Sequence, residues 1–207
     1  MGEGAAGDEA VSVGVDPAVD TSVALDTSGA LDAAGAGPAA GVLVVGYGNP
    51  LRSDDGVGPA VADRLAADPR LRGAEVRTQH QLTPELALDA STASLLVLID
   101  AADDVPPGDV AIRDLAPRSR GGTADALAGR SGEGGPPLTH NVDPASVVTL
   151  AEELWGSAPR TVLVGIGPAS LELGDRLTPV ASAAVPVAVE AVVAAVAAWR
   201  AVAVGER

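Results

Sequence analysis

The chain has 207 residues, with 28 acidic residues, 13 basic residues, two histidines and no cysteine, and its formal net charge is −15. This acidity disfavours nucleic acids and anionic membranes as partners. The absence of cysteine excludes disulfides, thiol nucleophiles and cysteine-ligated metal sites, and the absence of lysine excludes Schiff-base chemistry. We find no secretory signal or lipidation motif, and we expect a cytoplasmic protein.

Residues 1–40 hold seven acidic residues, no basic residue and many small residues. They lack the sustained apolar periodicity of a helix or a strand, and a segment of this composition cannot bury enough apolar surface to fold. We therefore expect a disordered acidic tail over residues 1–40, followed by a single domain over residues 41–204.

Residues 41–65 are typical of a strand, a glycine-rich turn and a helix. The apolar run from Val42 to Val45 indicates a strand that is buried on both faces. Ser53 stands in the position of a helix N-cap, and Asp54 and Asp55 follow it in the first turn, where the helix dipole favours carboxylates. In an open α/β sheet these acids would lie at the carboxyl end of a strand, where ligands bind.

A dinucleotide site is another interpretation of a glycine-rich turn after a strand. Such a site needs a third glycine at the start of the helix, where this chain has Leu51. Two aspartates near a helix N-terminus would also repel a phosphate. The turn therefore favours a cation over a nucleotide, and an acidic helix start with a purely structural role is the alternative.

Strands and helices alternate along the rest of the chain. We expect strands over residues 74–78, 94–99, 109–115 and 160–166, and helices that begin at Thr83, Asp143 and Thr178. This alternation predicts an α/β protein, a three-layer α/β/α sandwich with a mostly parallel, twisted sheet.

Two segments depart from this alternation. Residues 117–137 hold six glycines and three prolines, and we expect a flexible loop there. The last helix is apolar enough to raise the question of a membrane span. Because Pro186, Glu190 and Arg200 interrupt its apolar sequence, we expect that it does not enter a membrane.

Polar residues with chemical potential fall where the predicted strands end or the helices begin. These are Asp54 and Asp55, Asp100 and His140, and a parallel sheet would bring them to one edge. Two carboxylates and an imidazole can hold a divalent transition metal. From spacing alone, it remains open whether Asp100 only caps a turn and His140 only lies in a loop. His80, the other histidine, suits a surface position, with a role in the site as the alternative.

Five sequence blocks, in order, resemble the hydrogenase maturation proteases, the endopeptidases that trim the C-terminus of the large subunit of nickel–iron hydrogenases. The blocks are GYGNPLRSDDGVG at 46–58, HQLTPEL at 80–86, LIDA at 98–101, TH at 139–140, and the glycine- and proline-containing stretch at 165–179. The resemblance extends over about residues 42–200 and omits the tail and the glycine-rich loop. Five blocks in order are much more specific than any one of them.

In this family an acid in the first block, an aspartate after a buried strand and a histidine before a later helix bind a metal. The matching residues are Asp55, Asp100 and His140, and the resemblance implies that they are both the metal ligands and the catalytic residues. Some members have Glu in place of Asp55, and many have Glu or Gln in place of Gly167. The implied metal is nickel, which the substrate supplies and the enzyme need not hold permanently.

The resemblance implies a hydrolase, an aspartyl or metal-dependent endopeptidase that removes a C-terminal peptide from the nickel-loaded large-subunit precursor. Water would attack the peptide bond without a covalent intermediate. Asn49, Asp54 and His80 are candidates for substrate binding, water activation or orientation of the ligands. We expect a monomer whose partner is this precursor. The alternative is a non-catalytic nickel-sensing or chaperone-like binding protein of the same fold.

Overall fold

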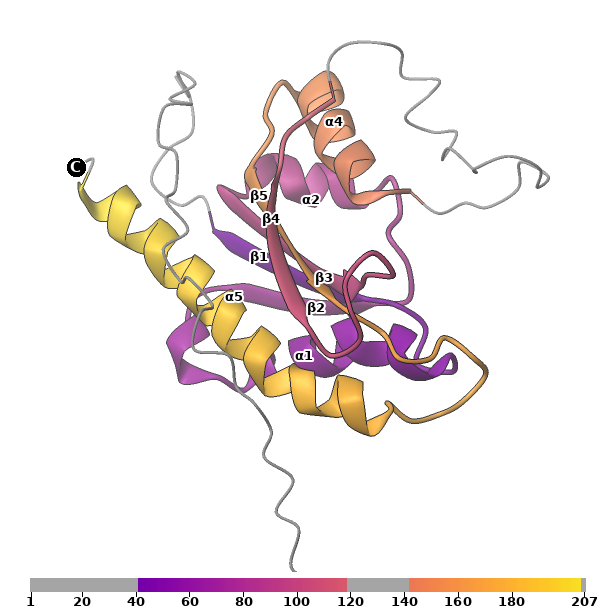
Figure 1. Cartoon of the computed structure of the whole chain (residues 1–207). Coiled ribbons are helices and arrows are strands. Elements are labelled where there is room, and N and C mark those ends of the chain that lie inside the picture. Colours follow the sequence, from indigo (N-terminus) through magenta and orange to yellow (C-terminus); the bar gives the residue numbers. More distant parts are fainter. Residues whose placement is uncertain (1–40, 119–141, 206–207) are drawn as a thin grey trace, which may run out of the picture. The chain divides into compact units, whose positions relative to one another are not determined.

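The structure, a computed structural model, describes residues 41–118 and 142–205. The predicted tail over residues 1–40, positions 119–137 of the predicted flexible loop, and His140 lie outside the described residues. Within the described residues the chain forms one five-stranded sheet with helices on both of its faces (Figure 1).

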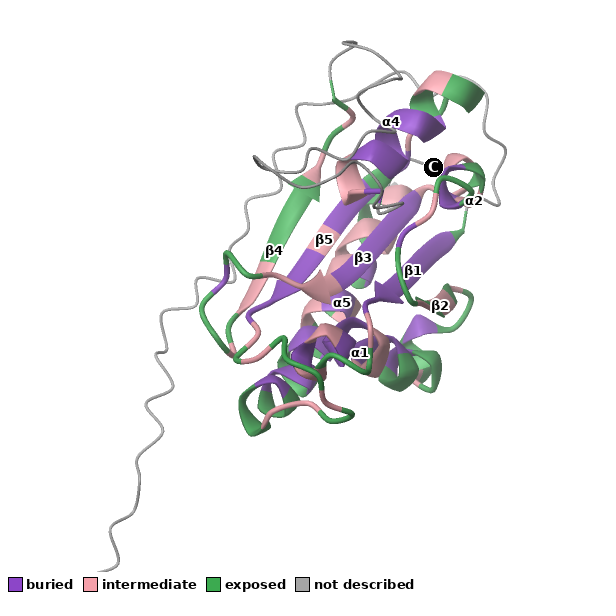
Figure 2. Ribbon diagram, turned by 90° about the vertical axis from the view of Figure 1, so that its right-hand side faces the viewer, coloured by how far each residue is buried: buried purple, intermediate pink, exposed green. Residues whose placement is uncertain are grey.

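The sheet is mostly parallel. Its strands are β1 (Val42–Tyr47), β2 (Glu75–Gln79), β3 (Leu95–Ala101), β4 (Val110–Leu115) and β5 (Arg160–Ile166). They lie in the order β2-β1-β3-β5-β4, and only β4, at one edge, pairs antiparallel with its neighbour. Figure 2 shows β1, β3 and β5 largely buried and β4 largely exposed. The continuous apolar runs therefore became the inner strands, as expected for strands that are covered on both faces.

The helices form one layer on each face of the sheet. They are α1 (Val57–Ala66), α2 (Leu86–Thr92), α4 (Pro144–Trp155) and α5 (Pro179–Gly205), with short 3-10 turns η1 (Ser53–Gly56) and η2 (Pro69–Leu71). Helices α1 and α5 cover one face, and α2 and α4 cover the other (Figure 1). The predicted three-layer α/β/α sandwich is confirmed.

Alternation along β1 builds a separate apolar core on each face. Val42 and Val44 pack into the core beneath α1 and α5, whereas Leu43 and Val45 pack into the core beneath α2 and α4. Each fully buried Leu or Val side chain contributes roughly 1.5–3 kcal/mol relative to exposure. Because β1 is buried on both faces, the surrounding core holds its carboxyl end in position, and the next loop starts there.

Helix α5 is the longest helix and lies against α1 and the sheet. It begins after Thr178, whose hydroxyl accepts a hydrogen bond from the Ala181 amide, and it continues through Pro186. Its segment Pro179–Ala203 is the one described helix that is long and apolar enough to cross a membrane by length and composition. The core helix of a water-soluble domain can pass the same test, and the buried side of α5 forms part of the core beneath it.

The start of α1 differs from the prediction. Ser53 is not an N-cap: it has a φ of 48°, lies in the 3-10 turn η1, and the α-helix begins only at Val57. The reason is a backbone pairing with the loop before α5, in which the Ser53 amide donates to the Gly174 carbonyl at 3.0 Å. A distant segment therefore determines the local conformation.

Candidate active site

The loop after β1 brings Asp55 back beneath the strand end. Gly48 has a φ of 136°, and a Cβ built there would lie 1.8 Å from the Asp55 carbonyl oxygen. Only glycine can adopt this conformation without strain at so close an approach. The glycine in the first sequence block is therefore required by the packing of the chain against itself.

Asn49 fixes the position of Asp55. Its amide donates to Oδ2 of Asp55 at 3.0 Å, and its side-chain Oδ1 accepts from the Leu51 amide at 2.9 Å. The Asp55 side chain is half-buried, and Oδ1 of this carboxylate accepts no hydrogen bond from the described residues. Within the described residues, Asp55 is thus held through one oxygen only, and the Asn49 side chain stabilises the turn through the Leu51 amide.

Asp54 has the opposite environment. It is 0% exposed, and its carboxylate accepts hydrogen bonds from the amides of Ala169 (2.8 Å), Ser170 (3.1 Å) and Thr178 (2.7 Å) and from the Thr178 hydroxyl (2.9 Å). Burial alone would raise the pKa of Asp54, but these hydrogen bonds together hold it below its usual value. This geometry gives Asp54 the role of joining two loops, whereas a substrate contact would need exposed surface.

Asp100 lies at the end of β3 and is the second half-buried acid at this edge. Its Oδ1 accepts a hydrogen bond from the Ala101 amide at 2.8 Å. Burial is the main reason that the pKa of Asp100 rises to about 7, and the charges of Asp55 and Asp103 add to it. Asp55 thus lies near enough for its charge to act on Asp100, and the joint role of the two acids as metal ligands stays a prediction.

The structure describes only one of the two histidines, His80. His80 directly follows β2 and is exposed, so it lies at the same carboxyl edge as Asp100. His140, the predicted third ligand, is outside the described residues. Among residues 41–118 and 142–205, no three histidine, aspartate or glutamate side chains are arranged to hold a metal ion. Asp55 and Asp100 are the part of the predicted ligand set that the structure describes.

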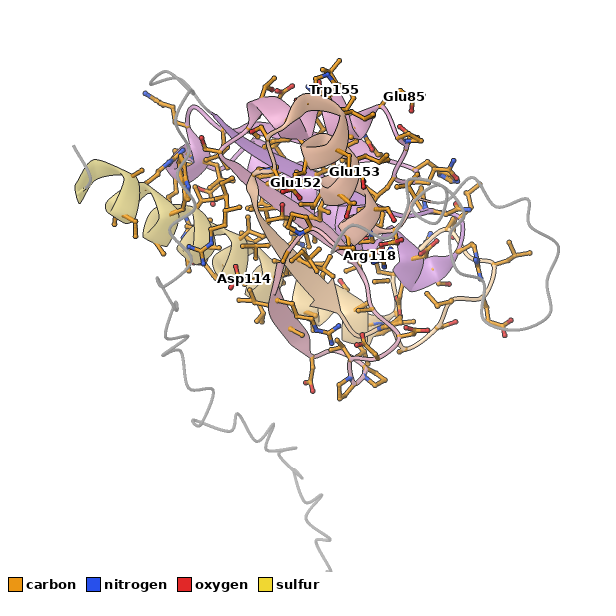
Figure 3. All side chains as sticks on the ribbon, turned by 90° about the horizontal axis from the view of Figure 1, so that it is seen from above. Glu85, Asp114, Arg118, Glu152, Glu153 and Trp155 are labelled. Carbon is orange, nitrogen blue, oxygen red and sulfur yellow. The ribbon has the colours of Figure 1, made fainter. Side chains whose placement is uncertain are left out.

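Two features of this edge gave no signal in the sequence. One is Tyr47, which falls in the predicted glycine-rich turn but is the last residue of β1 and is buried. The other is an ion pair at the start of α4, where Arg118 contacts Asp143 at 3.0 Å and the Arg118 amide donates to the Thr149 hydroxyl. Figure 3 shows Arg118 near one end of α4 and Trp155 at the other. The strand alternation could have identified Tyr47, because Val45 and Tyr47 must face the same side.

The arrangement suits hydrolytic chemistry. Two half-buried carboxylates with free oxygens can ligate a divalent cation or orient a water molecule. A carboxyl group with a pKa of about 7 can also exchange a proton with water at neutral pH, which a general base must do. Asp54 joins the loop that carries Asp55 to the loop before α5.

No protein-family model matches the chain, and a search of curated proteins finds no match. Solved structures do match. A hydrogenase 2 maturation peptidase from Thaumarchaeota archaeon SCGC_AB-539-E09 shares 29% sequence identity, over 76% of this chain and 98% of that one, with a TM-score of 0.54. The hydrogenase maturating endopeptidase HybD from E. coli shares 26%, over 75% and 91%, with a TM-score of 0.53. A further endopeptidase from Escherichia coli shares 25%, over 75% and 91%, with a TM-score of 0.54.

This chain matches these structures over nearly their whole length. The sequence blocks that contain Asp55 and Asp100 lie at one edge of the shared sheet. Sequence and fold thus lead to the same family by separate routes. The chain has the fold of the hydrogenase maturation proteases, resembles them in sequence and is a peptidase.

Proposed function

We propose that this peptidase removes a C-terminal peptide from the nickel-loaded large-subunit precursor of a nickel–iron hydrogenase, in the cytoplasm and as a monomer. The observation that supports this most strongly is the pair Asp55 and Asp100. Both are half-buried, each has a carboxylate oxygen that accepts no hydrogen bond from the described residues, and they lie at the ligand-binding edge of a fold shared with hydrogenase maturation endopeptidases.

In this proposal nickel is part of the substrate. Asp55 and Asp100 contribute oxygen ligands to it and His140 contributes an imidazole, so that the bound precursor is held with its scissile bond at this edge. A thiolate would compete strongly for the ion, and the chain has no cysteine. An oxygen and imidazole set is therefore suited to contact the nickel and release it with the product.

The chemical step adds water across the peptide bond. The water oxygen attacks the carbonyl carbon, one water proton passes to a carboxylate, and that proton is then delivered to the leaving amine. Asp100 suits the proton transfer because its pKa is about 7. No covalent enzyme intermediate is needed.

The other predicted site residues have supporting roles in this scheme. His80 is exposed at the same edge and is placed to contact the substrate. Asn49 positions Asp55 through its amide, and Asp54 joins the loop of Asp55 to the loop before α5. Of the three, His80 has the most exposed surface for substrate binding.

The test is incubation of the purified chain with the large-subunit precursor in nickel-loaded and nickel-free forms, followed by mass spectrometry. We expect one C-terminal peptide from the loaded precursor and little or none from the nickel-free form, with Asp55→Asn as the inactive control. Equal cleavage of both forms would contradict the role of nickel. Binding of the loaded precursor without any cleavage would indicate a nickel-sensing or chaperone-like binding protein instead.

A further inference from the structure

Two loops at the carboxyl edge of the sheet are joined along their backbones. One follows β1, and the other lies between β5 and α5 (Figure 1). The Ser53 amide donates to the Gly174 carbonyl at 3.0 Å, and the Gly174 amide donates to the Leu51 carbonyl at 3.0 Å. The Arg52 side chain adds a hydrogen bond to the Leu171 carbonyl at 3.3 Å. The two loops therefore form one platform whose backbone is held in place.

This platform exposes three leucine side chains. Leu51 is 63% exposed, Leu171 36% and Leu173 90%, and Leu173 is the most exposed large apolar residue in the part of the chain that the structure describes. Leu51 and Leu171 each accept a hydrogen bond from the other loop, and Leu173 directly precedes Gly174. We call these three leucines the leucine patch. Single exposed leucines are common on protein surfaces, whereas several on one fixed backbone are typical of a surface that binds another protein.

The leucine patch is continuous with the candidate active site. The Leu51 amide donates to Oδ1 of Asn49 at 2.9 Å, and the Asn49 amide donates to Oδ2 of Asp55 at 3.0 Å. Leu51 thus belongs to the same hydrogen-bonded turn that holds the Asp55 carboxylate. A molecule that lies on the patch is therefore beside this carboxylate.

The charges around the leucine patch balance. The patch lies within residues 51–53 and 171–176, whose charged residues are Arg52, Glu172, Asp175 and Arg176. Two positive and two negative charges give these stretches a formal net charge of zero, in a chain whose net charge is −15. Because no single sign of charge dominates here, the surface favours a partner that binds through its own apolar side chains.

We propose that the leucine patch is a docking surface for the body of the large-subunit precursor, next to the C-terminal peptide that is removed. This inference rests on the proposed function, because it takes the precursor as the substrate. Contacts away from the scissile bond hold a protein substrate in position for the reaction, and the patch lies where the rest of the precursor would approach. A second copy of this chain on the patch would instead cover the loop of Asp55 and obstruct the site.

The first test is calorimetric titration with the nickel-free precursor, because docking through leucines does not depend on the metal. The proteins compared are the wild type, a double variant with Leu171→Ser and Leu173→Ser, and Leu154→Ser, a control that is 61% exposed on α4. We expect the double variant to bind about 10- to 100-fold more weakly, as for the loss of buried leucine side chains, and the control to bind as the wild type does. Equal affinity of all three proteins, or no binding by the wild type, would overturn the proposal.

Cleavage of the nickel-loaded precursor gives a second test. We expect KM of the double variant to rise by a similar factor with kcat unchanged, because the patch would hold the substrate and its transition state equally. A fall in kcat with KM unchanged would overturn the proposal. If the wild type cleaved no precursor, the proposed function would be lost, while the titration would still decide whether the patch docks this protein.

Sedimentation of the chain alone tests the other occupant of the patch. We expect the wild type and Leu173→Ser to sediment alike, since the patch is reserved for the precursor in this proposal. A wild-type dimer that Leu173→Ser dissociates would assign the patch to a second copy of the chain and overturn the proposal.

Discussion

Two carboxylates in this part of the fold have pKa values that are shifted in opposite directions. One is Asp54, within the group of hydrogen bonds from Ala169, Ser170 and Thr178 that we call the clasp. The other is Asp100, at the carboxyl edge of the sheet, which we call the edge. The clasp surrounds its carboxylate with four donors, and the pKa of Asp54 falls although burial opposes this. At the edge, Asp100 is half-buried, accepts one hydrogen bond among the described residues and lies near two negative charges, and burial raises its pKa to about 7.

This difference separates structure from function. A carboxylate whose lone pairs are met by the protein stabilises the fold and has no capacity for a ligand. A carboxylate that is buried without enough donors destabilises the folded chain when ionised, and a bound cation or a proton relieves that cost. The second arrangement is typical of groups that are selected for chemistry.

The largest expected effect is on activity. Asp55→Asn and Asp100→Asn each keep the shape of the side chain and remove its charge, so we expect cleavage to fall by roughly 100- to 10,000-fold, the usual range for a lost acid–base group. The rate of peptide release, measured by mass spectrometry, checks this. Asp63→Asn on α1 is the matched control and should retain wild-type activity. Wild-type rates in both site variants would remove these residues from the mechanism.

The next effect is on stability through the clasp. Asp54→Ala leaves the amides of Ala169, Ser170 and Thr178 without their acceptor, and we expect a loss of about 3–5 kcal/mol, as for breaking a buried charged network. Urea unfolding measures it, with Asp63→Ala as the exposed control. A loss no larger than that of the control would show that the clasp does not hold the loops together.

A third prediction concerns pH. In the folded chain Asp100 keeps its proton up to about pH 7, whereas in the unfolded chain it loses it near pH 4. The folded state then binds more protons between these values, so this group lowers the free energy of unfolding as pH rises through the window. Asp100→Asn removes that loss. The free energy of unfolding of the variant should therefore exceed that of the wild type by an amount that grows with pH and reaches roughly 4 kcal/mol above pH 7.

Urea unfolding of the metal-free wild type and Asp100→Asn across this pH range provides the measurement. Asp63→Asn, on the exposed side of α1, is the control and should follow the wild type closely. A difference between Asp100→Asn and the wild type that stayed constant from pH 4 to pH 8 would contradict the raised pKa of Asp100.

The smallest effect is expected at the start of α4. Arg118 and Asp143 form an ion pair whose side chains are 56% and 35% exposed, and exposed pairs contribute about 0.2–1 kcal/mol. Arg118→Ala retains the backbone hydrogen bond to Thr149, so we expect a destabilisation within this range in urea unfolding. Arg64→Ala on α1 is the control, and a loss above about 2 kcal/mol would give this ion pair a larger role than its exposure allows.

Local sequence was sufficient for most of the fold. The runs over 94–99 and 160–166 predicted the inner strands because buried parallel strands are apolar on both faces. Asp143 before Pro144 predicted the start of α4, and the Asp143 side chain does accept from the Ser146 amide at 3.1 Å. These are signals whose physical cause lies within a few residues.

The errors lie where distant segments meet. Ser53 satisfies the local rule for an N-cap, but its backbone pairs with Gly174, so the rule fails. Asp54 is predicted from sequence to bind substrate, activate water or orient the ligands, and its partner Thr178 lies 124 residues away. No pattern within a few residues of Asp54 could reveal that its carboxylate is enclosed by the loop before α5.

The comparison between the clasp and the edge is tested most directly by Asp54→Asn and Asp100→Asn measured side by side. Each variant is assayed at about pH 8 for its free energy of unfolding without metal and for its rate of precursor cleavage. We expect opposite outcomes: Asp54→Asn less stable than the wild type, and Asp100→Asn more stable than the wild type but inactive. An Asp100→Asn variant that is less stable than the wild type and still cleaves the precursor would contradict the account.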